Sequence, residues 1–394
     1  MPRVKCPKCS KVETVLKSGF IRQKQRYYCK ECNYNFTLNH ENRKAKNKTR
    51  KNYQTTILDI GKAMGISATT VSRALRDHPD ISAVTIKAVK QVALEMEYRP
   101  NLMARNFANK QTQTIGVIIP DLESTFFSSM LGGIQKVASK FGFKVIICLS
   151  NEDYETEIEN VQVLIDSRVD GLLICHSATT TAFDYIDNYC KKGISIVNFY
   201  RISPSNKISK VLAKNTEGAE KITEHLLDQG CKKIGIILGP KSLSITEERL
   251  LGYLNILKKN KMDIDKELIA YTDYSSTSIN AVVDDWLNLN ERPDAIFCIS
   301  DRSAIFAIKH LKKRKVKVPD EIAVVGFGND LMGELIEPSL TTYNIQTSKI
   351  GETTMQLFLQ EYKNDSDNET QIQTIDGELL IRESSIKKKR KQSK

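Results

Sequence analysis

The sequence predicts a multi-domain chain, made of a small cysteine-rich ribbon, an all-α helix-turn-helix unit and a two-lobed α/β body. Three observations support this prediction. Four cysteines form two C-x2-C pairs near the start of the chain. Two short helical patterns meet at a glycine within residues 55–75. Beyond residue 113, short apolar runs alternate with amphipathic stretches, which is typical of a parallel sheet with helices on both faces.

The charge of the chain is concentrated at its beginning. Residues 1–54 carry 15 Lys and Arg against 3 acidic residues, and residues 55–113 carry 8 against 5. Residues 114–394 carry 36 against 39, so the whole formal excess of +12 lies before the body. This distribution predicts that the first part of the chain meets phosphate groups. We expect a cytoplasmic protein with no membrane partner, because the sequence shows no long apolar run and no secretory signal.

The four cysteines near the start have the spacing of a zinc site. Each C-x2-C pair can place two thiolates on one tight turn, and 19 residues separate the two pairs. Because the protein would fill all four tetrahedral positions, we expect a structural Zn2+ that folds a segment too short to build its own core. Two disulfides, or iron in the same ligand set, are the alternatives. The candidate ligands are Cys6, Cys9, Cys29 and Cys32.

Basic and aromatic residues alternate between the cysteine pairs, from Arg22 to Tyr28. This mix suits a phosphate-facing surface and equally suits the solubility of a small ribbon. With CPKC, QRYYCKEC and the trailing Phe36, the first 36 residues resemble the N-terminal zinc ribbon of bacterial insertion-sequence transposases. The resemblance implies association with DNA and does not imply transposition, because no spaced acidic triad follows. Residues 40–54 predict a flexible basic linker.

Residues 55–75 predict a helix-turn-helix. Thr56 can cap a first helix and Asp59 can reach back to it, as in a capping box. Gly65 can end that helix with a positive φ, and Ser67 can cap a second helix. An ordinary helical hairpin is the alternative. Ser82 can cap a third helix with an apolar face formed by Val84, Ala88, Val92 and Leu94.

Seven apolar runs predict the strands of the body, and the number of strand and helix units indicates two lobes. In such parallel sheets, ligands bind beyond the carboxyl ends of the strands. The runs cover residues 115–120, 144–150, 171–177, 194–200, 233–239, 295–300 and 322–328.

Most of the chain, from about residue 55 to 384, resembles the lac-repressor/gal-repressor (LacI/GalR) family of transcriptional regulators. The motifs that carry the resemblance are DIGKAMGISATTVSRAL, ISAVTIKAV, EYRPNLMAR and TIGVIIPD. The resemblance implies a body like the type I periplasmic-binding proteins, a homodimer, and double-stranded DNA with a pseudo-palindromic operator as partner. We divide the chain into a zinc ribbon (1–39), a basic linker (40–54), a helix-turn-helix headpiece (55–100), a hinge helix with its linker (101–113), a two-lobed effector-binding and dimerisation domain (114–386) and a basic tail (387–394).

The resemblance also implies roles in DNA contact. In the second helix it assigns base contacts to Ala68, Thr69 and Arg73, of which Arg73 can bond guanine with two hydrogen bonds. A solvated helix charge is the alternative for Arg73. In the hinge it assigns to Phe107 the place of an apolar wedge that kinks the minor groove. The full set of candidate DNA contacts is Thr56, Ser67, Ala68, Thr69, Thr70, Ser72, Arg73, Asn101, Arg105 and Phe107.

In the body, the resemblance implies a small-molecule effector between the lobes, either a sugar or a related polar metabolite. Among the candidate contacts, Phe126 and Phe127 could instead belong to the core, and Arg249 could be a surface charge. The common acidic residue after the seventh run is replaced by Gly328, which leaves the identity of the effector open. We place the three lobe crossovers near 213–216, near 326–330 or slightly later, and near 341–347. For the second, the alternative is that the strand that closes it belongs wholly to the C-terminal lobe. The candidate effector contacts are Phe126, Phe127, Arg249, Tyr274, Asp301 and Asn329.

The predicted function is sequence-specific transcriptional regulation, most simply repression, under the control of an effector. We expect no enzymatic activity, because the sequence has no phosphate-binding GxxxxGK[ST] loop and no G-x-S-x-G elbow, and its five histidines are dispersed. Two alternatives stay open: a transposon-associated DNA-transacting protein, and a ligand sensor that acts through a protein partner docked on the ribbon.

Overall fold

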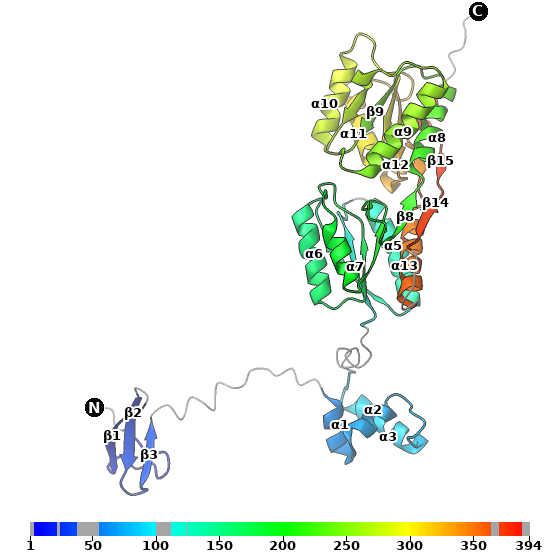
Figure 1. Cartoon of the computed structure of the whole chain (residues 1–394). Coiled ribbons are helices and arrows are strands. Elements are labelled where there is room, and N and C mark those ends of the chain that lie inside the picture. The colour runs from blue at the N-terminus through cyan, green and yellow to red at the C-terminus, as the bar shows by residue number, and fades with distance from the viewer. Residues whose placement is uncertain are drawn as a thin grey trace, which may run out of the picture. The chain divides into compact units, whose positions relative to one another are not determined.

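The computed structural model describes residues 4–21, 24–37, 55–99, 112–123, 125–363 and 370–387 (Figure 1). The chain divides into two compact units, residues 1–105 and 106–394, and each is described by itself. The candidate hinge contacts Asn101, Arg105 and Phe107 lie outside the described residues. No helix of the described part is long and apolar enough to cross a membrane.

The ribbon is a three-stranded antiparallel sheet of β1 (Val15–Ile21), β2 (Lys24–Cys29) and β3 (Tyr34–Thr37). Its apolar interior is small, because only Tyr27 and Phe36 contribute large buried side chains beside the cysteines. These two residues pair across β2 and β3, with ring centroids 5.8 Å apart. So small a core needs a cross-link to hold a fixed fold.

The headpiece contains three helices whose starts follow the predicted caps. They are α1 (Ile57–Met64), α2 (Ala68–Ala74) and α3 (Ala83–Glu95). Thr56 and Asp59 form the capping box, Gly65 ends α1 with a φ of 67°, and Ser67 accepts the Thr70 amide. These predictions are confirmed.

The third helix and its Ser82 cap are confirmed, but of the apolar residues expected along it Val92 and Met96 pack on the headpiece core, whereas Val84 and Leu94 do not. Val84 and Leu94 are 81% and 75% exposed, whereas Val89 and Ala93 are buried with Ile60 of α1. Apolar residues occur on several sides of α3, so its sequence alone does not determine which side packs on the other helices. The contact with α1 and α2 selects the face formed by Val89 and Ala93.

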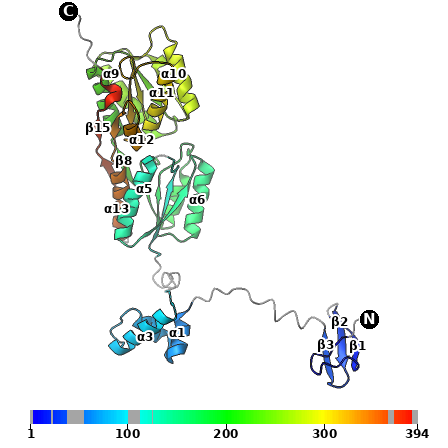
Figure 2. The same cartoon turned by 180° about the vertical axis from the view of Figure 1, so that it is seen from behind.

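The body consists of two lobes, each a six-stranded, mostly parallel sheet between helices (Figures 1 and 2). The first lobe has the strand order β14-β8-β7-β6-β4-β5. Its strands are β4 (Thr114–Ile119), β5 (Lys144–Leu149), β6 (Gly171–Ile174), β7 (Ser195–Phe199), β8 (Ser209–Ala213) and β14 (Ile372–Ile375), and its helices are α5 (Thr125–Lys140), α6 (Tyr154–Asp166), α7 (Asp184–Lys191) and α13 (Thr347–Lys363).

The second lobe has the order β10-β9-β11-β12-β13-β15, in which only β15 runs antiparallel to its neighbour. Its strands are β9 (Ile234–Leu238), β10 (Ile269–Tyr271), β11 (Ala295–Cys298), β12 (Ala323–Phe327), β13 (Thr341–Asn344) and β15 (Glu378–Leu380), and its helices are α8 (Asn215–Asp228), α9 (Ser244–Lys259), α10 (Ser276–Leu287), α11 (Asp301–Lys313) and α12 (Leu331–Leu335), with short 3-10 turns at Lys266–Leu268 and Glu383–Ser385.

Both faces of each sheet are covered, which explains the continuous apolar runs. In β4, Val117 packs with Met130 of α5 and Ile350 of α13 in one buried cluster. Ile118 faces the opposite layer and packs with Leu164 of α6. All seven predicted runs contain strands of these sheets.

Three segments connect the lobes. The chain passes from β8 to α8 at residues 213–215 and from β13 to α13 at 344–347, within two of the predicted ranges. The crossover predicted at 326–330 is wrong, because β12, α12 and β13 all belong to the second lobe. The third connection lies between β14 and β15 at 375–378. It was missed because β14 is short and partly exposed, and therefore lacks the apolar pattern of a central strand.

Candidate functional sites

The four cysteines of the ribbon converge on one point. Their Sγ atoms all lie within 4.8 Å of one another, with Cys6 and Cys29 buried. Each pair is followed by a residue with positive φ, Ser10 at 60° and Asn33 at 50°. The two knuckles therefore have the same turn, and four sulfurs with no competing oxygen ligand form a donor set that fits zinc.

Hydrogen bonds favour a thiolate in this cluster. Thr14 Oγ1 lies 3.4 Å from Cys29 Sγ, and the backbone amide of Lys8 donates to Cys6 Sγ at 3.4 Å. Hydrogen bonds from Thr14 and from the backbone at Cys32 lower the pKa of Cys29. Metal ligation needs the deprotonated sulfur, so these donors prepare the site for a cation.

The second helix of the headpiece presents the residues assigned to DNA contact. Thr69 and Arg73 are exposed, whereas Ala68 is half-buried. Arg73 lies 3.6 Å from Asp80 in an ion pair whose side chains are both more than half exposed. Such a pair is weak in water and leaves the guanidinium available to another acceptor.

Several of the other candidate DNA contacts form hydrogen bonds that cap the helices. Ser67 Oγ accepts the Thr70 amide at 3.1 Å and lies 2.8 Å from Thr70 Oγ1. The Thr56 hydroxyl donates to Asp59 at 2.7 Å, and Ser72 is half-buried on α2. The caps place their residues at helix N-termini, where free amides attract phosphate.

A cavity of about 480 Å³ lies between the two lobes. Its walls come from the segments that follow the parallel strands, as expected for such sheets. Five of the six candidate effector contacts line it, namely Phe126, Phe127, Arg249, Tyr274 and Asp301. The lining in the described part of the chain does not include Asn329, whose carboxamide oxygen accepts from Arg382 at 3.0 Å.

Aromatic rings form one wall of the cavity. The centroids of Phe126 and Phe127 are 5.3 Å apart, and Tyr200 lies 4.9 Å from Phe126. Phe127 is also buried in the main core, so it both packs in the core and lines the cavity. Ring faces of this kind suit the apolar faces of a sugar or a flat heterocycle.

Arg249 is buried in α9 and is not a surface charge. Its Nε and Nη2 both donate to Asn215 Oδ1, at 3.0 and 2.7 Å. Nη1 donates to the backbone oxygen of Ile299, and Nη2 also reaches the Tyr200 hydroxyl at 3.3 Å. Arg249 therefore joins both lobes at the base of the cavity.

Asp301 opens α11 and is 3% exposed. Its Oδ1 accepts the Thr342 hydroxyl at 2.6 Å, and its Oδ2 accepts the Asp330 amide at 2.7 Å. Burial raises its pKa to about 6, although both hydrogen bonds act in the opposite direction. Asp301 can thus carry or release a proton near neutral pH, and can accept from a ligand hydroxyl.

One ion pair in the cavity was not predicted. Arg201 Nη1 donates to both carboxylate oxygens of Glu152, at 2.8 and 2.7 Å. Arg201 Nε is buried and has no hydrogen-bond partner among the described residues. Both residues closely follow predicted strands, so their position at the strand ends was the available signal.

Two family models match the chain. "Bacterial regulatory proteins, lacI family" matches residues 56–101, and "Periplasmic binding proteins and sugar binding domain of LacI family" matches residues 112–383. Both matches lie beyond the ribbon.

The matches to curated relatives cover nearly the whole length of those proteins. The ribose operon repressor of Halalkalibacterium halodurans is 30% identical, over 84% of this chain and 97% of its own. The repressor CytR of Escherichia coli is 29% identical (84% and 96%), and the repressor PurR of Vibrio atlanticus is 26% identical (83% and 97%).

The fold also matches solved structures. The Lac repressor dimer bound to operator and the anti-inducer ONPF has a TM-score of 0.75 at 24% identity, over 84% of this chain and 99% of that one. With two family models covering the headpiece and the body in the expected order, the chain belongs to the LacI family of bacterial regulatory proteins, and it is a DNA-binding transcriptional regulator controlled by a small-molecule effector.

Proposed function

We propose that this protein is a homodimeric repressor whose affinity for a pseudo-palindromic operator is set by a small polar metabolite in the inter-lobe cavity. The observation that carries the proposal is the cavity itself, which brings charged and aromatic side chains of both lobes together. The relatives named above are repressors, and the Lac repressor structure is a dimer on its operator. The similarity of this chain to repressors, one of them solved as a dimer on its operator, supports the proposal.

On the DNA side, we assign base reading to α2, with Arg73 as the main specific contact. The exposed Thr69 and the methyl of Ala68 contribute apolar contacts. Thr56, Ser67, Thr70 and Ser72 meet phosphates at the helix starts. The hinge contacts Asn101, Arg105 and Phe107 complete the interface at the centre of the operator.

On the effector side, the aromatic wall would stack on the ligand, while Asp301 and Tyr274 accept or donate hydrogen bonds. Arg201 offers the unpaired Nε that the protein leaves unused. Since Asn329 is bound to Arg382 in this structure, a role for Asn329 requires that this hydrogen bond exchange for one to the ligand. A sugar or a related hydroxyl-rich metabolite satisfies these groups best.

The lobes touch across the cavity through contacts that a ligand can strengthen or break. Arg302 and Glu123 form an ion pair at 3.2 Å, and the amide of Leu331 donates to Thr125 Oγ1 at 3.3 Å. A ligand that prefers one arrangement of the lobes shifts the population of that arrangement. Its effect on operator affinity cannot exceed this preference, by thermodynamic linkage.

Selection from random double-stranded DNA at moderate salt tests the regulatory function. We expect enrichment of an inverted repeat, with half-sites spaced as for two headpieces. Enrichment of no inverted repeat would contradict the proposal. A thermal-shift screen of sugars and nucleosides then identifies the effector class, because a ligand of the native state raises the unfolding temperature.

We further propose that the ribbon binds one structural Zn2+ through Cys6, Cys9, Cys29 and Cys32. Because both family matches begin after the ribbon, a second function is considered for it: the chain is a ligand sensor that acts through a protein partner docked on the ribbon. Deletion of residues 1–39 separates the two. Weaker operator affinity indicates a DNA contact by the ribbon, whereas unchanged affinity with lost regulation indicates a partner.

A further inference from the structure

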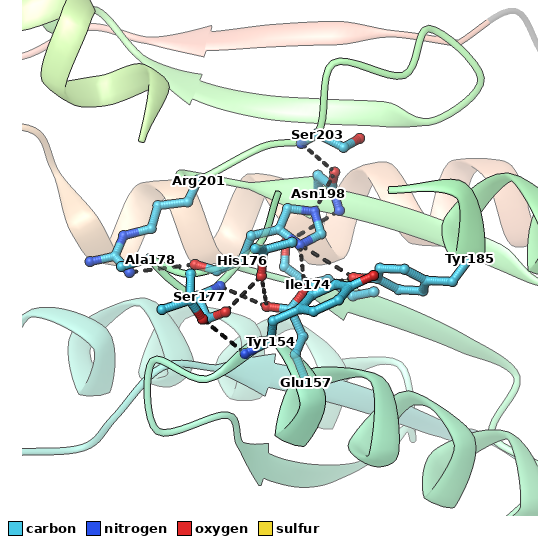
Figure 3. Close-up of polar contacts among 12 residues, drawn as sticks. Tyr154, Glu157, Ile174, His176, Ser177, Ala178, Tyr185, Asn198, Arg201 and Ser203 are labelled. Atoms are coloured by element: carbon cyan, nitrogen blue, oxygen red, sulfur yellow. Dashed lines mark hydrogen bonds and ion pairs between the residues drawn. The ribbon is translucent and has the colours of Figure 1, made fainter. Parts of the chain in front are cut away.

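A buried polar cluster lies in the first lobe, next to Ala178 and Arg201 of the cavity lining (Figure 3). At its centre is His176, which lies two residues after the end of β6 and is 2% exposed. Its Nδ1 lies 2.8 Å from Glu157 Oε1, and its Nε2 lies 3.0 Å from Asn198 Oδ1. Glu157 and Asn198 are fully buried. Each ring nitrogen therefore faces an oxygen, and water does not reach the ring.

The orientation of Asn198 is fixed by the backbone. The amide of Ser203 donates to Asn198 Oδ1 at 3.0 Å, and Asn198 Nδ2 donates to the carbonyl of Ile174 at 3.4 Å. A flipped carboxamide would lose both hydrogen bonds. Asn198 thus offers His176 an acceptor, and His176 Nε2 must carry a proton.

Glu157 likewise favours a proton on the other ring nitrogen of His176, Nδ1. Its carboxylate accepts the Tyr185 hydroxyl at 2.6 Å, the Ser177 amide at 2.6 Å and the Thr180 hydroxyl at 3.1 Å. Burial opposes the charge on Glu157, but hydrogen bonds, of which that from His176 is the largest, keep its pKa below the ordinary value. An ionised Glu157 calls for a donor at His176 Nδ1, so the two oxygens that face the ring favour a proton on each of its nitrogens.

The groups around His176 balance this charge. Glu157 faces it from α6, Tyr185 from α7 and Asn198 from β7, while the Phe183 ring lies 5.1 Å away, edge-on. On the cavity side, Arg201 Nη1 lies 3.4 Å from the His176 carbonyl and pairs with Glu152. Two buried cations therefore match two carboxylates. Burial raises the pKa of the neighbouring Cys175 thiol to about 12, which keeps it neutral.

The same two carboxylates hold the segment 177–180 at the edge of the cavity. Glu157 holds the Ser177 amide, as described, and Glu152 Oε2 accepts the Ala178 amide at 2.7 Å. Ala178 and Thr179 line the cavity. The carbonyl of Ala178 also accepts the Ser242 hydroxyl from the second lobe. This segment is thus both a wall of the cavity and a contact between the lobes.

We propose that His176 is a positioning residue of the effector site: held as an imidazolium between Glu157 and Asn198, it fixes the segment 177–180 in the shape that lines the cavity and meets the second lobe. The proposal rests on the proposed role of the cavity. Loss of the second proton leaves Glu157 as a buried carboxylate without its cation, which destabilises the folded cluster that holds the Ser177 amide and the Thr180 hydroxyl.

Nitrogen-15 NMR of the full chain, labelled at its histidines, tests the protonation state directly. Neither effector nor DNA is added, so the result is independent of whether the cavity binds a metabolite. His176→Asn assigns the signal, because it removes one of only five histidines. Near pH 7.5 we expect both ring nitrogens of His176 to show the shift of a protonated nitrogen. A neutral tautomer would overturn the proposal; where His176→Asn fails to fold, single substitutions of the other four histidines assign the signal by elimination.

Amide hydrogen exchange tests the consequence. His176→Asn keeps one donor toward Glu157 and cannot carry the charge, so we expect exchange at residues 177–180 to quicken by about tenfold. His310→Asn is the matched control, because His310 also faces a carboxylate but lies in the second lobe. Its Nε2 is 2.7 Å from Asp284 Oδ1. It should leave residues 177–180 unchanged.

The pH profile separates charge from simple packing. After correction for intrinsic exchange, wild-type protection at 177–180 should fall as the NMR signal of His176 loses its second proton. In His176→Asn, protection should be low at every pH. Protection that stays constant in the wild type while His176 deprotonates would overturn the proposal. Failure to find any cavity ligand would instead count against the proposed function alone.

Discussion

The guanidinium carbon of Arg249 lies 3.7 Å from the centroid of the Phe327 ring, so a charge on α9 of the second lobe rests on the aromatic end of β12. The opposite edge of the same guanidinium reaches the Tyr200 hydroxyl in the first lobe. Arg249 is 2% exposed, and its charge is dispersed over a ring and several acceptors. It combines a stabilising role in the second lobe with a place in the cavity lining.

Arg249→Met tests the stabilising role. The substitution keeps the apolar contact with Phe327 but leaves the buried oxygens of Asn215 and Ile299 without their donor. We expect the free energy of unfolding to fall by about 2–4 kcal/mol, measured by urea denaturation without ligand. Arg292→Met, at an exposed ion pair with Glu321, should change it by less than about 0.5 kcal/mol. Equal effects of the two substitutions would contradict the role.

Asp301 makes stability depend on pH. Its pKa is raised from an ordinary 3.8 to about 6 in the folded chain. A carboxyl with a raised folded pKa binds its proton more tightly in the native state. Stability is therefore lost as pH rises between these two values, by roughly 2–3 kcal/mol in total.

Asp301→Asn should remove this loss. Asparagine can still accept the Asp330 amide and can donate to the Thr342 hydroxyl, so the two existing contacts survive. We expect the variant to gain about 2 kcal/mol over the wild type as pH rises from about 4 to 7, in urea unfolding at a series of pH values. Parallel pH profiles for the two proteins would show that Asp301 does not titrate in this range.

The elements that the sequence predicted share one property, a local signal. The seven central strands are continuous apolar runs, and the headpiece caps lie beside the amides they bind. β13 was missed because its Thr341 and Thr342 are polar yet fully buried. Their hydroxyls bond to Ser385 and Asp301, which are distant in sequence. Such burial depends on partners that only the folded chain brings together.

The candidate effector site likewise contains residues that have a local sequence signal and residues that have none. Position after a strand, together with family resemblance, placed five residues at the cavity. The Glu152–Arg201 pair was missed because the two residues lie 49 positions apart and neither stands out alone. Asn329 was assigned by its place in the motif. Arg382, on the last segment of the body, binds it instead, and no local pattern connects the two.

Zinc content tests the ribbon. We expect one Zn2+ per chain in the purified protein, and loss of that zinc in Cys29→Ser, whose sulfur is buried at the centre of the cluster. The ribbon should then lose its strands, because its own core is too small, while the headpiece and body keep their fold. Metal analysis and amide exchange report both effects. Cys148→Ser, in β5, is the matched control and should keep the zinc; retained zinc in Cys29→Ser would exclude the four-sulfur site.

Operator affinity tests Arg73. If its guanidinium bonds a guanine in the major groove, Arg73→Ala should weaken operator binding by about 1–3 kcal/mol and relax the preference at one base pair of each half-site. Lys90→Ala is the control, because Lys90 on α3 is held by Asp77 at 2.6 Å, and its loss should change affinity little. Binding is measured at several salt concentrations, since loss of a phosphate contact lowers the salt dependence, whereas loss of a base contact changes specificity. Uniform weakening on every sequence would assign Arg73 to the phosphate backbone and leave base reading to Ala68 and Thr69.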